Sequence, residues 1–172
     1  MAKLRTVRAD DVDVLVEIAV RSWRDVEASI DALLGSPLDR LVTPSWRSHH
    51  EAVVRAACHS DATSVVVAVD GEDTPVGFVG YRVHPASPGM SEYGEVEVLA
   101  VDPPARGRGV GRALLDRAVT DLRVAKVPVI LLQTGGDDGH APARALYESA
   151  GFRRLPTAQY WLEGHRHDER DH

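Results

Sequence analysis

The sequence has a single cysteine, no long apolar run and no apolar segment at its start. Because Cys58 is the only cysteine among 172 residues, no disulfide can form within the chain, and we expect a reducing, cytoplasmic setting. No run reaches the roughly 18 apolar residues of a membrane span, so we expect no membrane partner. The first six residues also lack the apolar core of a signal peptide.

Basic charge is also scarce. The formal net charge is −6, from 20 Lys and Arg against 26 Asp and Glu. This balance argues against a nucleic-acid partner, which needs a basic surface. It agrees with a cationic amine substrate and equally with plain solubility. Three histidines near the end have neither cysteines nor a rigid element beside them, so we expect a solvated tail and no metal at His165, His167 and His172.

Two familiar phosphate-binding patterns are absent as well. A Rossmann fingerprint, G-x-G-x-x-G, begins at Gly107 and Gly109 but meets Arg112 where the third glycine belongs. A Walker loop requires a Gly-Lys pair, which the sequence does not contain. The glycine-rich segment around these residues must therefore be interpreted from its position between other elements.

That segment, residues 106–112, reads Arg-Gly-Arg-Gly-Val-Gly-Arg. An alternating strand pattern precedes it at residues 95–101, and an amphipathic helix pattern follows at residues 110–125. The first N–H groups of a helix have no partner within the helix, and the helix dipole adds positive charge there. Glycine lets the backbone approach a ligand closely. We therefore predict a phosphate site whose charge comes from Arg106, Arg108 and Arg112.

Length and patterning predict one domain. A chain of 172 residues with 44% hydrophobic and 27% charged residues is of the ordinary globular type. We assign residues 1–164 to a single domain and residues 165–172 to a charged tail. Alternating or β-branched runs predict strands at residues 4–7, 64–69, 75–83, 91–101, 129–132, 153–155 and 158–162. Helical spacing predicts helices at residues 10–30, 45–58, 110–125 and 141–150.

A second segment supports the phosphate site. Residues 140–152 read His-Ala-Pro-Ala-Arg-Ala-Leu-Tyr-Glu-Ser-Ala-Gly-Phe, which resembles the signature N-x-x-A-x-x-L-Y-e-x-x-G-F of the GNAT superfamily of N-acetyltransferases. His140 stands where that family usually has Asn, and the matching positions are Ala143, Leu146, Tyr147, Gly151 and Phe152. The family's [QR]-x-x-G-x-[GA] loop is matched upstream by Arg106, Gly109 and Gly111. The resemblance covers residues 76–161.

The resemblance implies both a fold and a cosubstrate. The fold is of the α/β (α+β) class, with a mixed, mostly antiparallel sheet of about seven strands. This sheet is splayed between the fourth and fifth strands and has helices on both faces. The cosubstrate is acetyl-CoA, whose pantetheine amides would pair with the open edge of the fourth strand. The implied cofactor-binding residues are Leu99, Ala100, Val101, Arg106, Gly107, Arg108, Gly109, Val110, Gly111, Arg112, His140, Arg144 and Tyr147.

In such an enzyme the acceptor amine attacks the thioester directly. The amine must first lose a proton, because an ammonium group, with a pKa of about 10, has no lone pair. Tyr147 matches the family's tyrosine and is the expected acid for the leaving sulfur. Glu97 and Glu95 lie two residues apart on the predicted fourth strand, so both point to one face. Either is a candidate base, with Glu97 nearer the cleft, and a solvent-facing row of charges is the alternative.

The sequence is less informative about the acceptor. The expected pocket residues are the aromatic side chains Trp23, Trp46, Tyr81 and Tyr160. We expect acetyl transfer to a primary amine of a small molecule. The alternatives are transfer to a protein or peptide amine, and a non-catalytic domain that senses acyl-CoA. A homodimer agrees with the family resemblance. The identity of the acceptor, the acyl-chain preference and the general base stay open at this point.

Overall fold

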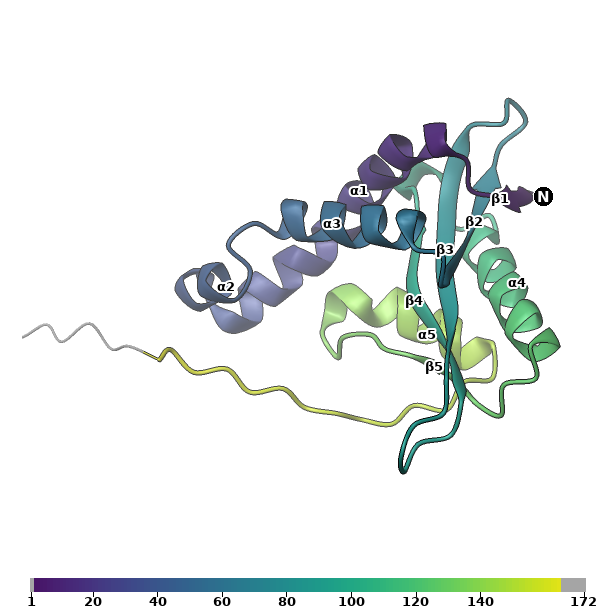
Figure 1. The fold of residues 1–172 in the computed structure, drawn as a ribbon. Coiled ribbons are helices and arrows are strands. Elements are labelled where there is room, and N and C mark those ends of the chain that lie inside the picture. The colour runs from purple at the N-terminus through teal and green to yellow at the C-terminus, as the bar shows by residue number, and fades with distance from the viewer. Residues whose placement is uncertain (1, 165–172) are drawn as a thin grey trace, which may run out of the picture.

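The computed structural model describes residues 2–164, so the predicted charged tail and its three histidines lie outside the described residues. The described chain forms one sheet with the strand order β1-β2-β3-β4-β5 (Figure 1). Strands β1 to β4 pair antiparallel, and β5 pairs parallel with β4, which confirms the predicted mixed sheet. The strands are β1 (Lys3–Thr6), β2 (Thr63–Val69), β3 (Pro75–His84), β4 (Tyr93–Val101) and β5 (Ile130–Leu132).

Helices cover both faces of the sheet, as predicted (Figure 1). One face carries α1 (Val12–Leu34) and α3 (Trp46–His59), which are joined by an unpredicted short helix, α2 (Ser36–Val42). The other face carries α4 (Val110–Val124), and α5 (Ala141–Ser149) packs against the same core. Three 3₁₀ turns complete the chain: η1 (Ala9–Asp11), η2 (Pro103–Ala105) and η3 (Asp138–His140). Within residues 2–164, no helix combines the length and the apolar character needed to cross a membrane.

Each face of the sheet has its own hydrophobic core. Leu15 and Ile18 of α1 are fully buried against the sheet, and Leu114 and Leu115 of α4 are fully buried on the opposite face. Burying a side chain of this size contributes roughly 1.5–3 kcal/mol to stability. The interior strand β2 is covered on both faces, so five successive residues, 65–69, are buried and apolar.

A bulge in β4 changes which face its side chains point to. Gly80 of β3 pairs with Val98, but the next residue, Tyr81, pairs with Val96, so Glu97 is the extra residue. Val96 therefore packs into the core beside α4, whereas Val98 packs into the core beside α1 and α3. A bulge bends its strand and increases the local twist. This bulge directly follows Val96, the last residue of β4 that pairs with β5.

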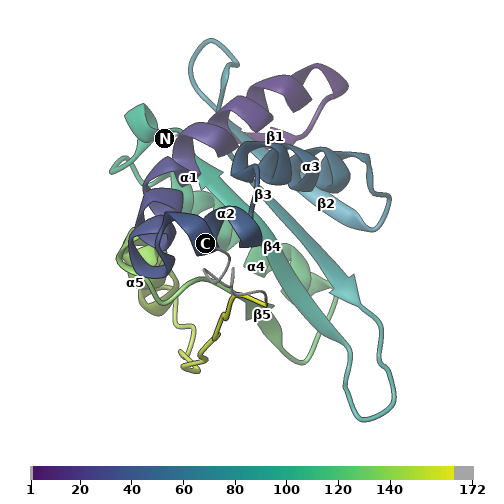
Figure 2. The ribbon, with the colours of Figure 1, turned by 90° about the vertical axis from the view of Figure 1, so that its left-hand side faces the viewer.

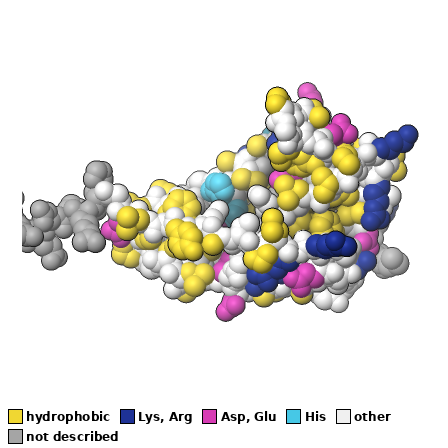
Figure 3. Space-filling view, turned by 90° about the horizontal axis from the view of Figure 1, so that it is seen from below, with side chains coloured by type: hydrophobic (Ala, Val, Ile, Leu, Met, Phe, Trp, Pro, Cys, Tyr) yellow, Lys and Arg dark blue, Asp and Glu magenta, His cyan; other side chains and the backbone are white. Residues whose placement is uncertain are grey.

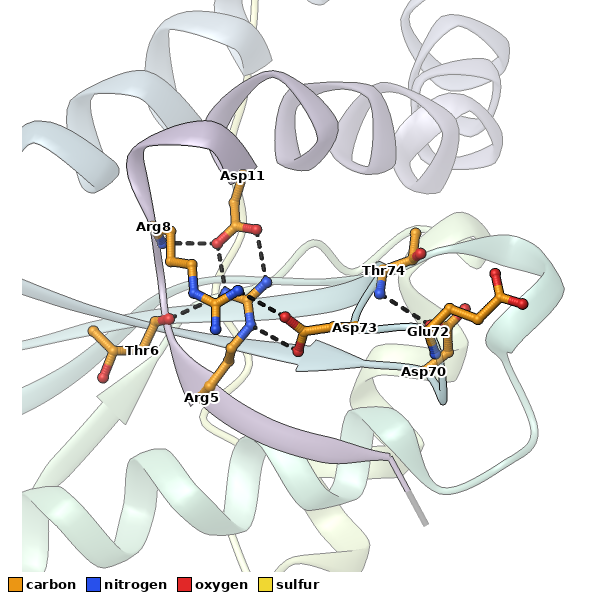
Figure 4. A network of polar contacts seen from close by, with 8 residues as sticks. All are labelled: Arg5, Thr6, Arg8, Asp11, Asp70, Glu72, Asp73 and Thr74. Carbon is orange, nitrogen blue, oxygen red and sulfur yellow. Dashed lines mark hydrogen bonds and ion pairs between the residues drawn. The ribbon is translucent and has the colours of Figure 1, made fainter.

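An ion-pair network fixes the start of the chain against the sheet (Figure 4). Arg5 donates to both carboxylate oxygens of Asp11 at 2.6 and 2.8 Å, and the Arg8 backbone N–H donates to the same carboxylate. Asp73, in the turn between β2 and β3, accepts from both arginine side chains. The hydrogen bonds from Arg5 lower the pKa of Asp11 below its usual value, although burial opposes them. The network joins β1, η1 and the β2–β3 hairpin.

The last two predicted strands do not form, so the sheet has five strands and not seven. Residues 152–163 contain neither helix nor strand, and they extend away from the body of the molecule (Figures 1 and 2). Within this segment, the exposed fractions of Leu155, Tyr160 and Leu162 are 83%, 92% and 88%. A strand is stable only beside a partner. Here β5 provides an edge of only three residues, which does not hold a neighbour.

Candidate active site

The separation of β4 from β5 opens a cleft of about 600 Å³. β5 pairs with β4 only at residues 94–96, so from Glu97 onward β3 is the only strand that pairs with β4 among the described residues. This confirms the predicted splay between the fourth and fifth strands. Four groups of residues line the cleft: residues 22–26 of α1 except Arg24, residues 96–101 of β4, the loop that leads into α4, and residues from Gln133 to Tyr147.

The loop before α4 has the backbone that its glycine-rich sequence predicts. After η2, Gly107 and Gly109 adopt φ angles of 74° and 78°. Nothing lies within 4 Å of a Cβ built on either residue, so the left-handed conformation itself requires glycine. Gly109 is the N-cap of α4, which places the unpaired N–H groups of the first helical turn at the cleft wall. Backbone of this kind binds phosphate.

The three arginines of this loop are placed differently. Arg106 lines the cleft, where its Nη2 donates to the Ser22 carbonyl at 2.8 Å and its Nη1 lies 3.8 Å from the Asp25 carboxylate. Arg112 also lines the cleft, and its Nε lies 2.8 Å from a carboxylate oxygen of Asp116. Arg108 is exposed and does not line the cleft. The structure therefore brings two of the three predicted charges to the site.

The open edge of β4 lies inside the cleft. Leu99, Ala100 and Val101 all line it, and on the side away from β3 they have no strand partner. The Ser22 hydroxyl of α1 donates to the Val101 carbonyl at 2.8 Å. Asp102, the residue after Val101, accepts two hydrogen bonds of 2.9 and 3.1 Å from Arg21 of the same helix. These contacts fix α1 against the end of β4.

Tyr147 lines the cleft from α5. Its ring meets Phe152 edge to face, with the ring centroids 6.4 Å apart. Burial raises the pKa of the Tyr147 hydroxyl above its usual value, and within residues 2–164 no side chain or backbone group bonds to that hydroxyl. A hydroxyl in this setting stays protonated, as a proton donor must. The helix ends at Ser149 with Ala150 as its C-cap, and Gly151 follows in the C′ position with a φ of 90°, as the sequence predicts.

Glu95 and Glu97 share one face of β4, as predicted, but both are bound to neighbours. Arg82 Nε lies 2.9 Å from one oxygen of Glu97, and the Thr63 hydroxyl donates to the other at 3.1 Å. The His84 ring nitrogen Nε2 lies 2.6 Å from a Glu95 oxygen. Of the two glutamates only Glu97 lines the cleft.

The same cluster has the spacing of a metal site, because ligand atoms of His84, Glu95 and Glu97 lie within 4.8 Å of one another. Arg82, however, reaches into it: its Nε lies 3.1 Å from His84 Nε2 as well as 2.9 Å from Glu97. The guanidinium already supplies the positive charge that these carboxylates require. We therefore assign no metal to the cluster.

Of the four predicted acceptor residues, the structure brings only Trp23 and Trp46 together, on the ring of His50. Trp23 lines the cleft and stacks on the His50 ring, with centroids 4.3 Å apart. Trp46 meets the edge of the same ring at 6.0 Å but does not line the cleft. Tyr81 is buried in the α4-side core, on the other face of the sheet, where it bonds to Asp121. Tyr160 lies in the exposed segment that leaves the body.

The two remaining predicted cofactor-binding residues, His140 and Arg144, differ in whether they line the cleft. His140 lines the cleft, and its Nδ1 lies 2.5 Å from a carboxylate oxygen of Asp137. Arg144 does not line the cleft but donates to the carbonyls of Gly135 and Asp137 at 2.7 and 2.6 Å. Asp137 was not predicted. Its signal in the sequence is an acidic residue three positions before a histidine in a glycine-rich turn.

These features define the class of the protein. A mixed sheet that separates beside a glycine-rich helix N-terminus, with a half-buried tyrosine on the cleft wall, is the architecture of an N-acetyltransferase domain. The chain belongs to the acetyltransferase (GNAT) family, whose model matches residues 27–152. The family membership that the two sequence segments predicted is thus confirmed.

Comparisons with individual proteins agree with this assignment. A mycothiol acetyltransferase from Rhodococcus opacus (strain B4) is 32% identical over 149 residues, which are 84% of this chain and 48% of that protein. The chain spans less than half the length of the curated relatives that it matches.

Solved structures of the same fold have diverse names. An aminoglycoside antibiotic 6'-N-acetyltransferase from Acinetobacter haemolyticus has a TM-score of 0.65 at 12% identity, covering 95% of this chain and 99% of that chain. A ribosomal-protein-alanine N-acetyltransferase from Brucella melitensis biovar Abortus 2308 has a TM-score of 0.65 at 15% identity, with coverage of 95% and 99%. At these identities the likeness shows the fold alone.

Proposed function

We propose that the protein transfers the acetyl group of acetyl-CoA to a primary amine of a small molecule. The observation that carries this proposal is a single cleft lined by the phosphate loop, the unpaired edge of β4 and Tyr147. The name of the mycothiol acetyltransferase supports a small-molecule acceptor. The net charge of −6 agrees with an acceptor that is a cation in solution.

The cleft offers acetyl-CoA two kinds of backbone contact. The N–H groups at the start of α4 suit its pyrophosphate, because the helix dipole favours an anion there, and Arg106 and Arg112 add positive charge. The open edge of β4 at residues 99–101 suits the pantetheine amides, which pair as an added strand does. Bound in this way, acetyl-CoA supplies a thioester whose carbonyl carbon an amine can attack.

Tyr147 is the proposed acid that protonates the departing sulfur. It lines the cleft, its hydroxyl is not engaged by the described residues, and its raised pKa keeps the proton in place. Glu97 is less suited to be the base than its position in the sequence suggests. Both of its oxygens already accept, from Arg82 and from Thr63, so the acceptor amine would have to share the carboxylate with these two donors. Glu95 does not line the cleft.

The proposal is tested first by ligand binding and thiol release. Acetyl-CoA and free CoA should each raise the unfolding temperature, because a ligand that binds only the folded state stabilises it. A panel of aminoglycosides, polyamines, amino acids and short peptides is then screened for CoA release. Release with one small-amine class supports the proposal. Binding without release across the panel contradicts it and favours a protein acceptor or an acyl-CoA sensor, and no thermal shift contradicts the phosphate site itself.

We also propose that the protein is a homodimer. The support is the apolar segment that leaves the body, in which Leu155 and Leu162 are 83% and 88% exposed. Hydrophobic side chains are also spread over much of the surface seen from below (Figure 3). Exposed apolar area of this kind is typical of an interaction surface. Light scattering during size-exclusion chromatography should give twice the monomer mass of 18.7 kDa, and a mass of one chain at all concentrations would contradict the proposal.

A further inference from the structure

The turn before α5 is built around one ion pair. Asp137 Oδ1 lies 2.5 Å from His140 Nδ1. A Cβ on Gly135 would lie 2.4 Å from both Asp137 Oδ1 and His140 Nδ1, so only glycine leaves room for the pair at that position. Arg144 then holds the carbonyls of Gly135 and Asp137 from α5. The absence of a side chain at Gly135 and the two hydrogen bonds from Arg144 therefore both support the contact between the Asp137 carboxylate and the His140 imidazole.

The same turn is pressed against α1. A Cβ on Gly139 would lie 2.7 Å from the Val26 Cα and 3.0 Å from the Asp25 carbonyl, so the two backbones approach as closely as glycine allows. The Gly139 N–H donates to the Ser29 hydroxyl at 3.2 Å. His140 therefore sits where α1, which supplies Trp23 and Asp25 to the cleft, meets the start of α5. In Figure 2, α1 and α5 both lie to the left of the sheet.

The carboxylate of Asp137 is almost completely buried. Its side chain is 6% exposed, and its second oxygen, Oδ2, is buried without a hydrogen-bond partner among the described residues. Burial alone would raise the pKa of Asp137, but the hydrogen bond and charge of His140 lower it below its usual value. A buried charge is costly unless it is paired. His140 is the partner that the structure provides.

The pairing leaves one ring nitrogen of His140 for a ligand. Nδ1 is engaged by Asp137, His140 lines the cleft, and its side chain is 20% exposed, so Nε2 is the remaining group. A carboxylate on Nδ1 fixes the tautomer in which Nε2 is unprotonated and stabilises the ring once Nε2 takes a proton. Glu97, by contrast, has no oxygen left without a donor.

We propose that His140 is the general base of the acetyl transfer and that Asp137 is its positioning residue; this rests on the proposed function. The proton of the acceptor ammonium group moves to His140 Nε2, and the freed nitrogen lone pair forms the N–C bond to the acetyl carbonyl carbon. The C–S bond breaks, its electron pair goes to the sulfur, and the Tyr147 hydroxyl supplies the sulfur's proton. The nitrogen, which still carries two hydrogens, gives its second proton to the Tyr147 oxygen, and His140 releases its proton to solvent. The products are then the amide, the free thiol and one proton, and the site is restored.

Other titratable and charged groups line the same cleft as His140. Asp25 of α1, Asp138 of the turn, Tyr147 of α5 and Arg106 of the phosphate loop line the same cleft. Arg144 lies behind the turn on α5, with its Nη1 bonded to carbonyls. The pH dependence of kcat can therefore be attributed to His140 only by substituting that residue. The pH profiles of the His140 variants are compared with that of a variant at a histidine outside the cleft.

The test compares His140→Asn and His140→Gln with the wild type and with His84→Asn. His84 is a matched control, because it also lies 2.6 Å from a carboxylate and is 19% exposed but does not line the cleft. Asparagine at position 140 is the residue that the resembling family usually has. The readouts are kcat and KM for the amine over about pH 6 to pH 10, the Kd of acetyl-CoA by calorimetry, and the unfolding temperature.

We expect both His140 variants to bind acetyl-CoA as the wild type does but to lose about 100-fold in kcat near neutral pH. The loss should shrink as the pH approaches the amine pKa of about 10, because the amine then deprotonates without help. Asp137→Asn should show the same pattern more weakly, and His84→Asn should match the wild type. An unchanged kcat, a pH-independent loss or a loss confined to acetyl-CoA affinity would overturn the inference. Absence of turnover in the wild type would instead contradict the proposed function.

Discussion

The two walls of the cleft are built in different ways. The proposed cofactor wall is one continuous stretch, from the end of β4 through η2 to the start of α4, and backbone conformation at Gly107 and Gly109 shapes it. The acceptor wall joins α1 to the turn before α5, segments that are 110 residues apart at the Ser29–Gly139 hydrogen bond. A wall formed by the local backbone geometry of one segment can be predicted from the sequence. A wall formed by side chains from segments far apart in the chain cannot.

The largest effect on kcat is expected at Tyr147, which lies on α5 and belongs to neither of the two walls described above. Tyr147→Phe removes the proposed proton donor but keeps the ring against Phe152. We expect kcat to fall by roughly 100-fold or more, with the acetyl-CoA Kd unchanged by calorimetry. Tyr81→Phe is the matched control, since Tyr81 is buried on the other face of the sheet. Equal losses of kcat in both variants would mean that Tyr147→Phe lowers kcat by destabilising the protein and not by removing a proton donor.

A second substitution tests a contribution to stability that comes from outside the cleft. Asp11→Asn removes the carboxylate that accepts two hydrogen bonds from Arg5, which keeps Asp73 as its second partner. We expect the free energy of unfolding at pH 7 to fall by about 2 kcal/mol. The pKa of Asp11 is lowered in the folded state, so its contribution is present above the unfolded value of about 3.9 and is lost as the pH falls through the folded value. Urea unfolding at several pH values should therefore show the difference between variant and wild type shrinking in acid. A constant difference would contradict this account.

The cofactor wall is tested by Gly109→Ala. Alanine at a φ of 78° strains the loop, and we expect acetyl-CoA affinity to fall about tenfold, equivalent to roughly 1.4 kcal/mol. Gly89→Ala is the control, because Gly89 has a φ of 80° and open space around its Cβ in the turn between β3 and β4. The control should lose similar stability and keep its affinity in calorimetry. Equal affinities for the two variants would show that the loop does not bind the cosubstrate.

The smallest effect is expected at the acceptor wall. Trp23→Leu should raise the amine KM about fivefold without changing acetyl-CoA affinity, because one large contact surface is replaced by a smaller one. Trp46→Leu should lower the unfolding temperature but leave KM unchanged, since Trp46 contacts His50 and not the cleft. If both variants raise KM alike, the acceptor pocket extends to α3 and the sequence prediction for Trp46 is correct.

Much of the fold follows from local patterns. The strands β2 to β4 and the helices α3 to α5 begin and end within about two residues of their predicted bounds, because capping residues, glycines and prolines mark those ends. The last two strands fail for a non-local reason. Their alternation is real, but β5 is three residues long and offers too short a ladder to hold them.

The candidate site divides in the same way. The phosphate loop was predictable because its function depends on backbone that glycine alone allows. Tyr81 was misplaced because alternation does not say which face of a sheet meets the cleft, and the bulge at Glu97 shifts the register beside it. Asp137 was missed because its role depends on burial by α1 and Arg144, which lie far from one another in the chain.

The extra residue in β4 has a consequence for how this cleft is inherited. Pairing with β5 stops at Val96, and the bulge at Glu97 turns the strand away at that point. The width of the cleft thus depends on chain length at one position and not on the chemistry of any side chain. A lineage that lost Glu97 as a codon deletion would realign β4 with β5 and narrow the cleft, with every glycine and arginine of the loop intact. A survey of relatives by motif alone would still count such a protein as active.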